Sequence, residues 1–171
     1  MSAITIWPER DGDAPAIFAL TEAAFRAMPY ADGDEQELVG QLRAEGDLAL
    51  SLVAEDATRI VGHVAFSPVA ISDGSEGWFG LGPVSVWPEL QRQGIGSALI
   101  KRGIADLRES GGRGIVLVGD PAYYARFGFE CDPALRYDGA EPRYFQRLVL
   151  GGDAPRGAVT FAPAFSAARS A

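Results

Sequence analysis

Residues 88–98, PELQRQGIGSA, place two glycines where a helix is about to begin, directly after an apolar run. That run, residues 78–86, has the composition of a strand, and apolar residues then recur at helical spacing over residues 94–109. The next run, residues 114–118, is almost entirely apolar, as in a strand that is buried on both faces. A crossover helix makes its two strands parallel. The stretch therefore joins the carboxyl end of a central strand to the N-terminus of the crossover helix.

The rest of the chain alternates between short β-prone runs and helical segments. Asp11-Gly12-Asp13 supplies turn and cap residues before the first helix, and Gly46 ends the second. In chain order we expect a strand, two helices, two strands that form a meander with residues 78–86, a short helix, a closing strand and a further strand, over residues 3–7, 14–28, 34–46, 48–55, 59–72, 121–126, 144–150 and 157–161.

Composition limits the classes of protein. The chain has 171 residues, 47% hydrophobic and 22% charged, which fits one globular domain with a real core. A net charge of −8 argues against a nucleic-acid partner, because nucleic-acid binding depends on neutralising phosphates with Lys and Arg. Cys131 is the single cysteine, which suits a reducing cytosol. No stretch approaches the roughly 18 apolar residues of a membrane span. We therefore expect a cytoplasmic protein with no membrane partner.

The position of the two glycines indicates two possible roles. The first-turn amides of a helix lack intrahelical acceptors, and the helix dipole adds positive charge, so a phosphate fits there. Gly94 and Gly96 keep side chains away from such a group, while Arg92 and Ser97 offer further contacts. A plain turn between a strand and a helix explains the same glycines. On spacing alone both interpretations stay open.

Two common phosphate motifs do not fit. A dinucleotide-binding fingerprint needs a third glycine or alanine, but Leu99 stands at that position. A P-loop needs G-x-x-x-x-G-K-[ST], which the chain does not contain. The sequence does contain Gln91-x-x-Gly94-x-Gly96 after the central strand. This pattern resembles the acetyl-CoA signature Q/R-x-x-G-x-G/A of the GCN5-related N-acetyltransferases, or GNAT family.

The resemblance extends to a second motif. Residues 119–129, GDPAYYARFGF, are similar to the segment of the family in which a short helix bearing a tyrosine precedes an aromatic-Gly-Phe bend. Together with residues 81–96, LGPVSVWPELQRQGIG, they make the chain most similar to the YhbS-like subgroup of predicted acetyltransferases. The similarity covers roughly residues 3–150.

The resemblance implies an α/β (α+β) architecture, the GNAT fold. We expect a central mixed, mostly antiparallel sheet of six to seven strands, with a parallel splayed pair and about four flanking helices. Residues 1–150 would form a single N-acetyltransferase domain. Residues 151–171 would be a C-terminal extension with one possible strand and a frayed end.

The resemblance also implies an acetyl-CoA site without a metal. The backbone at Val84, Ser85 and Val86 would pair with the pantetheine arm, and Gln91 would position the loop. Asp120 stands where the family often has an asparagine that contacts the cofactor. The loop amides that would hold the pyrophosphate are those of Arg92, Gln93, Gly94, Ile95, Gly96 and Ser97.

The implied reaction needs an acid, an oxyanion donor and a base. Tyr124 matches the tyrosine that protonates the departing thiolate, although Tyr123 is an alternative and a core aromatic role also explains it. The Val86 amide would stabilise the oxyanion. The central strand contains no carboxylate or imidazole, so a water chain is one candidate for the base. His63, the only histidine, fits a hydrogen-bonded structural role better than catalysis.

The implied activity is N-acetyltransfer (EC 2.3.1.-) from acetyl-CoA to a primary amine in a ternary complex. The acceptor class is open between a small-molecule amine and a protein N-terminus or lysine. Glu22, Tyr30, Asp32 and Asp34 lie where the family shapes its acceptor pocket, and acidic residues there would suit a cationic amine. Helix caps and solvated faces explain any one of these residues equally simply. The alternative function is a non-catalytic CoA-binding sensor or partner module. A homodimer is a reasonable assembly.

Overall fold

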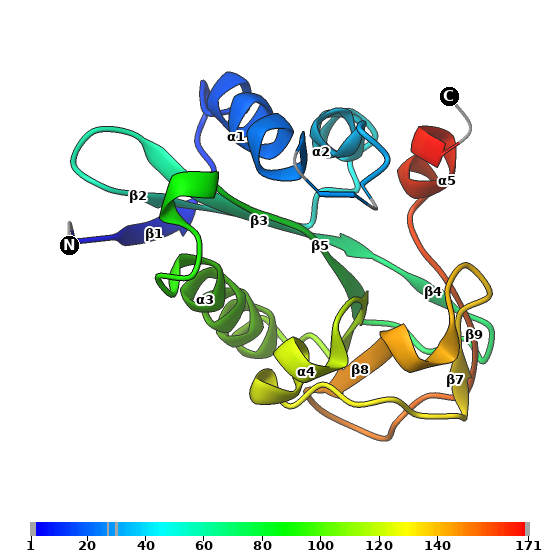
Figure 1. The fold of residues 1–171 in the computed structure, drawn as a ribbon. Helices are drawn as coiled ribbons and strands as arrows, with labels where there is room; N and C mark the ends of the chain where they lie inside the picture. The colour runs from blue at the N-terminus through cyan, green and yellow to red at the C-terminus, as the bar shows by residue number, and fades with distance from the viewer. Residues whose placement is uncertain (1–2, 27, 30, 170–171) are drawn as a thin grey trace.

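The computed structural model describes residues 3–26, 28–29 and 31–169 (Figure 1). Within them, helices and strands follow the predicted order, with short 3-10 turns (η) between some of them. The elements are β1 (Thr5–Pro8), α1 (Ala14–Arg26), α2 (Glu35–Ala44), β2 (Leu50–Glu55), β3 (Ile60–Pro68), β4 (Ala70–Ile71), β5 (Trp78–Val86), η1 (Pro88–Leu90), α3 (Ile95–Glu109), β6 (Gly114–Val118), α4 (Pro121–Tyr124), η2 (Ala125–Phe127), β7 (Leu135–Arg136), η3 (Pro142–Tyr144), β8 (Phe145–Val149), β9 (Gly157–Thr160) and α5 (Pro163–Arg169).

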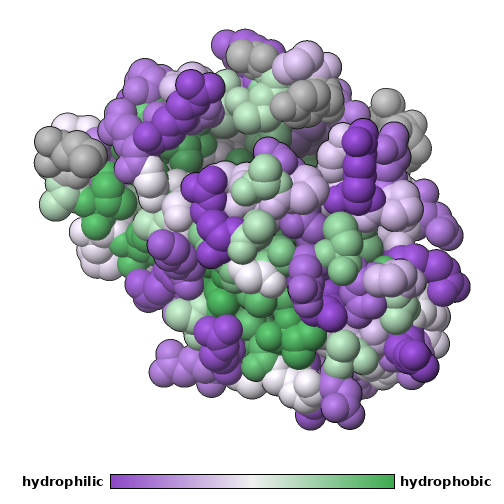
Figure 2. All heavy atoms as spheres, turned by 60° about the horizontal axis from the view of Figure 1, so that its bottom comes forward, coloured by the Kyte–Doolittle hydropathy of each residue, from purple (hydrophilic) through white to green (hydrophobic). Residues whose placement is uncertain are grey.

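The main sheet has six strands in the order β1-β2-β3-β5-β6-β8. The β5–β6 pair is parallel and the other pairs are antiparallel, which confirms the predicted mixed sheet. Helices α1 and α2 cover one face, while α3 and α4 cover the other (Figure 1). Figure 2 turns the face with α3 and α4 toward the viewer, where polar side chains surround a central apolar area.

Helix α3 is built by the apolar spacing that predicted it. Its buried residues include Ile95, Leu99, Ile100, Ile104 and Leu107, which pack onto the sheet in the main core. Its exposed side carries the charged residues. In the part of the chain that the structure describes, no helix combines the length and apolar character needed to cross a membrane.

Strands β5 and β6 diverge about halfway along β5. They pair only over residues 78–80 of β5, against residues 114–116 of β6. Opposite β3, the register slips between Val64 and Phe66, which face Val84 and Leu81 respectively. The extra residue on β5 is a bulge, and a bulge bends the strand that carries it. Among the described residues, the end of β5 therefore has β3 on one side and no strand on the other.

One predicted strand is wrong in its length. Residues 59–72 form two strands, β3 and β4, rather than one. β4 pairs with β9, which pairs in turn with β7, so these three short strands form a separate sheet. β9, the strand that pairs with β4, lies almost ninety residues later in the chain. A local sequence pattern cannot reveal such a contact.

The C-terminal segment contains a helix that we did not predict. β9 covers residues 157–160 of the predicted strand 157–161, and the chain then forms α5 where the sequence predicted a frayed end. Ala162 and Ala164 are buried against Leu38 and Leu42 of α2. Small side chains allow this close approach between helices. The residues whose composition suggested fraying thus add a fifth α-helix to the expected four.

Candidate active site

A cavity of about 680 Å³ opens where β5 and β6 diverge. It contains most of the residues predicted to bind a ligand, and it is lined by Met28, Val84, Val86, Leu90, Gln91, Arg92, Gly94, Ile95, Gly96, Ser97, Ile100, Asp120, Tyr123, Tyr124 and Arg126. Met28 follows α1, whereas Ile95 and Ile100 belong to α3 on the opposite face of the sheet. The cavity therefore spans both faces of the sheet through the gap beside β5.

The wall formed by β5 offers a backbone edge that pairs with no other strand among the described residues. The Trp87 N–H donates to the Val61 carbonyl of β3 at 3.3 Å. Because inward and outward backbone groups alternate along an antiparallel strand, the N–H and C=O groups of Val84 and Val86 point away from β3 and toward the gap. The Gln91 side chain donates to the Val86 carbonyl oxygen at 3.0 Å, which ties the following loop to the strand end.

The floor of the cavity is the first turn of α3. Gly94 is the N-cap, with a φ of +88°, and no side chain caps the helix. The first helical hydrogen bond runs from Ala98 to Gly94, so the N–H groups of residues 95–97 precede it. A Cβ on Gly96 would lie 3.8 Å from the Tyr123 hydroxyl and from methyl groups of Val84 and Val86. It would enter the cavity rather than the packed interior.

The loop before α3 places one cation at this turn. Arg92 lines the cavity and has a φ of +64°, a left-handed conformation that is uncommon outside glycine. Gln93 is exposed and does not line the cavity, although the sequence predicted it as part of the loop cradle. The unpaired amides, the helix dipole and Arg92 together form a site for an anion of phosphate type.

Two adjacent tyrosines form the wall opposite β5. The rings of Tyr123 and Tyr124 meet edge to face with centroids 4.9 Å apart. Burial raises the pKa of Tyr124 to about 12, with smaller contributions from Tyr123 and Asp120. Burial also raises the pKa of Tyr123. Both phenols therefore keep their protons at neutral pH and are hydrogen-bond donors there.

Asp120 lines the cavity and also holds α4 in place. It is the N-cap of α4, and its carboxylate accepts from the Ala122 N–H at 3.0 Å. The short helix that carries both tyrosines is thus fixed by this residue.

Sequence reasoning did not assign Met28, Leu90, Ile100 and Arg126 to the site. The Arg126 guanidinium lies 4.4 Å from the Tyr123 ring centroid, and its Nε donates to the Tyr123 carbonyl at 2.8 Å. The turn after α4 folds Arg126 back toward the cavity. Its position within GDPAYYARFGF could have indicated this role, because a cation near a phosphate site forms charge-assisted hydrogen bonds with the phosphate.

Ser85 lies in the predicted set but faces away from α3. Gly62 is paired with Val86, and a Cβ on Gly62 would meet Ile95 and Leu99 of α3. The next pair along, His63 and Ser85, must therefore point to the other face, beneath α1. Both side chains are buried.

His63 ends a chain of polar side chains between the sheet and the α1–α2 layer. Arg43 donates twice to the Glu9 carboxylate, each time at 2.8 Å. The Ser51 hydroxyl donates to Glu9 at 2.6 Å and lies 2.8 Å from His63 Nε2. Burial lowers the pKa of His63 to about 4, although the charge of Glu9 opposes this effect. His63 is consequently neutral at physiological pH.

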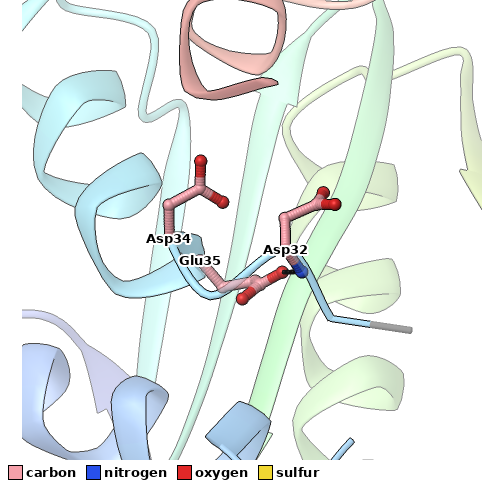
Figure 3. A group of neighbouring side chains, drawn as sticks. All are labelled: Asp32, Asp34 and Glu35. Atoms are coloured by element: carbon pink, nitrogen blue, oxygen red, sulfur yellow. Dashed lines mark hydrogen bonds between the residues drawn. The ribbon is translucent and has the colours of Figure 1, made fainter. Parts of the chain in front are cut away.

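The acidic residues predicted near an acceptor site are divided between two elements. Glu22 lies on α1, where it pairs with Arg26 at 3.3 Å, while Tyr30 lies outside the described residues. Asp32, Asp34 and Glu35 bring carboxylate oxygens within 4.8 Å of one another. Figure 3 shows the Glu35 carboxylate turned back to the backbone of Asp32. It accepts a hydrogen bond from the Asp32 N–H at 2.9 Å. This bond structures the turn before α2, so the cluster does not by itself indicate a metal site.

Taken together, the splayed parallel pair, the anion-binding turn and the half-buried tyrosines are the features expected of the GNAT fold. Residues 6–131 match the family model described as an acetyltransferase (GNAT) domain. The chain is 39% identical over 150 residues to the uncharacterized N-acetyltransferase YhbS of Escherichia coli strain K12, covering 85% of this chain and 86% of that protein. The chain belongs to the GNAT acetyltransferase family.

Two solved structures share this architecture over nearly their whole length. A GNAT family acetyltransferase from Brucella melitensis, in complex with acetyl-CoA, is 47% identical, with a TM-score of 0.86 over 96% of this chain and 99% of that one. The YhbS protein of Escherichia coli, in complex with CoA, is 34% identical, with a TM-score of 0.88 over 97% of this chain and 93% of that one. The predicted fold and family are therefore confirmed.

Proposed function

We propose that this protein transfers an acetyl group from acetyl-CoA to a primary amine by direct attack within a ternary complex. The observation that carries the proposal is a single cavity that joins the free amides of α3, the unpaired edge of β5 and two protonated tyrosines. The acetyl-CoA and CoA complexes of the two similar structures support the same ligand class.

The residues present fit acetyl-CoA. The backbone amides of Arg92 and of residues 94–97 would hold the pyrophosphate, and the Arg92 and Arg126 side chains, which line the same cavity, would add positive charge. The outward N–H and C=O groups of Val84 pair with the pantetheine arm in the manner of an added strand. Gly96 leaves the space that the ligand requires. When bound, acetyl-CoA supplies an activated thioester carbonyl.

The chemistry then needs a donor at each oxygen or sulfur that gains charge. The Val86 N–H points into the gap and stabilises the oxyanion that forms when the amine attacks. Tyr124 keeps its proton because burial raises its pKa to about 12, and it donates this proton toward the departing thiolate. Tyr123 packs against Tyr124 and orients its ring.

The acceptor reaches the thioester from the face covered by α1 and α2. Met28 lines the cavity from that side, and the acidic turn of Asp32 and Asp34 follows it in the chain. These carboxylates favour a cationic acceptor, either a small-molecule amine or the N-terminus or lysine of a protein.

The test is release of the CoA thiol. The purified protein is mixed with acetyl-CoA and a panel of acceptors that includes a polyamine, an aminoglycoside, amino acids and peptides with a free N-terminus or lysine. We expect amine-dependent thiol release that is greatest for cationic acceptors. A protein that binds acetyl-CoA in calorimetry but releases no thiol with any acceptor would instead be a CoA-binding module. A preference for neutral or acidic amines would refute the role of the acidic turn.

A further inference from the structure

Gln146 of β8 places a buried amide at the point where β6 ends. The residue is 1% exposed, and it pairs with Leu117 of β6, which packs in the main core. Its Nε2 donates to the Gly119 carbonyl at 3.0 Å and to the Tyr144 carbonyl at 3.3 Å. An amide nitrogen carries two hydrogens, so each carbonyl can receive one of them. The side chain therefore joins the turn that leaves β6 to the turn that enters β8.

Among the described strands, only β8 pairs with the end of β6. The last residue of β6, Val118, pairs with β8, and the Gly119 N–H donates to the Tyr144 carbonyl at 2.9 Å. On the other side, the pairing of β6 with β5 stops at Val116. The position of the segment that follows β6 therefore depends on its bonds to β8 and on the Gln146 amide.

The segment that Gln146 holds leads directly into the wall of tyrosines. Asp120 follows Gly119 in the chain and caps α4, which carries both tyrosines of the site. Gly119 also lies against the Tyr124 ring, because a Cβ added to Gly119 would be 2.6 Å from Cε2 of that ring. A displacement of the Gly119 peptide would therefore move the cap of α4 and one contact surface of the ring together.

On the basis of the proposed function, we infer that Gln146 is a positioning residue for Tyr124, the acid that protonates the departing thiolate. Gln146 does not line the cavity, so it acts through the Gly119 carbonyl and the start of α4. Proton transfer to a leaving group depends on the placement of the donor, and a misplacement of about 1 Å can lower a rate by about 10²-fold. An apolar side chain at this core position would need no partners, whereas the buried amide fixes the turn that carries the acid.

The experiment replaces Gln146 by methionine, an unbranched side chain that has no hydrogen-bond donor. We expect Gln146→Met to lower kcat in the thiol-release assay by about 10-fold, because Tyr124 loses its fixed placement. The Kd for acetyl-CoA in calorimetry should stay within about twofold of wild type, since the amides of α3 and the edge of β5 are unchanged. Ser110→Ala removes a side-chain bond to the Leu107 carbonyl at the C-terminal end of α3. It is the matched control and should leave kcat and Kd unchanged.

Combination with Tyr124→Phe separates positioning from a merely structural role. If Gln146 acts through the Tyr124 proton, Gln146→Met should cause no further loss of kcat in the Tyr124→Phe background, because residues that act as a unit are not additive. The same factor of loss in both backgrounds would overturn the inference. A kcat within twofold of wild type in the single variant Gln146→Met would also overturn it.

Gly119→Ala tests the same contact if Gln146→Met does not fold. It keeps both donors of Gln146, but its methyl group would force the Tyr124 ring to move. We expect a loss of kcat in the wild-type background and none in the Tyr124→Phe background. Unchanged kcat in Gly119→Ala would overturn the inference while leaving acetyl transfer intact. A wild-type protein that releases no thiol with any amine would refute the proposed function and this inference with it.

Discussion

Tyr124 combines a half-buried ring with a protonated hydroxyl. Its ring packs against Tyr123 and against Phe129, and the close approach of Gly119 to the ring leaves no room for a side chain at that position. These contacts fix the ring against the cavity wall. A phenol held in this way donates without a large entropic cost on reaction.

We expect Tyr124→Phe to lower kcat by about 10²-fold with nearly unchanged affinity for acetyl-CoA, because only the proton donor is removed. Steady-state thiol release and calorimetry measure the two effects. Tyr123→Phe is the control, since its hydroxyl lies near Gly96 at the anion-binding end. If Tyr123→Phe shows the larger loss of kcat, the two tyrosines exchange roles. Equal turnover in both variants would remove both from the mechanism.

His63 also makes stability depend on pH. Its folded-state pKa is about 4, below the ordinary 6.5, so between these values the unfolded chain binds more protons than the folded protein. The contribution of His63 to the free energy of unfolding is therefore fully present above pH 6.5. It falls as the pH drops, by about 3 kcal/mol at pH 4. Urea unfolding at several pH values measures this loss. His63→Gln should flatten the curve between pH 6.5 and 4, and an unchanged slope would show that other groups cause it.

At the scale of elements, the first turn of α3 contains a glycine that lowers the stability of the helix and leaves the cavity open. Gly96 lies within the helix, where alanine is preferred to glycine by about 0.5 to 1 kcal/mol. A Cβ there would make only ordinary contacts with protein atoms. Internal packing therefore does not require glycine at this position, whereas a ligand held against the first turn would.

We expect Gly96→Ala to raise the melting temperature slightly and to weaken acetyl-CoA binding by at least about 10-fold, because the methyl group would enter the space of the pyrophosphate. Thermal unfolding and calorimetry measure both. Gly40→Ala on α2, where a Cβ would meet nothing within 4 Å, is the matched control and should stabilise without changing affinity. Unchanged affinity in Gly96→Ala would place the anion elsewhere.

At the scale of the whole molecule, the C-terminal segment closes the fold. β9 joins β4 and β7, and Phe161 packs so closely on Gly80 of β5 that a Cβ on Gly80 would lie 2.8 Å from the ring. Ala162, just before α5, and Ala164 within it then pack against Leu38 and Leu42 of α2. The final residues thus pack against both the central strand β5 and helix α2.

We expect Ala164→Asp to destabilise the protein by about 2 to 4 kcal/mol, because it buries a charge without a partner against Leu38 and Leu42. Urea unfolding measures the loss. Ala105→Asp on the exposed side of α3 is the control and should stay within about 0.5 kcal/mol of wild type. If the two variants are equally stable, α5 does not contribute to the cooperative fold.

The sequence by itself determined the order of the elements, the crossover at α3 and the family. Each of these rests on local information: the 3.6-residue period of α3, the apolar run of β6 and the glycines of the Gln91–Gly96 signature. The same local signals pointed to Gln91, Arg92, Gly96 and Tyr124, which line one cavity in the structure.

Only the tertiary structure decided which distant residues share that cavity and which lie beneath it. Met28 follows α1 and Arg126 follows α4, which lie on opposite faces of the sheet, and both residues line the cavity beside β5. β4 leaves the main sheet for a strand near the C-terminus. Glu9, Arg43 and Ser51 meet at His63 from four different segments. Such contacts depend on the relative placement of whole elements, and no period or spacing within one segment records them.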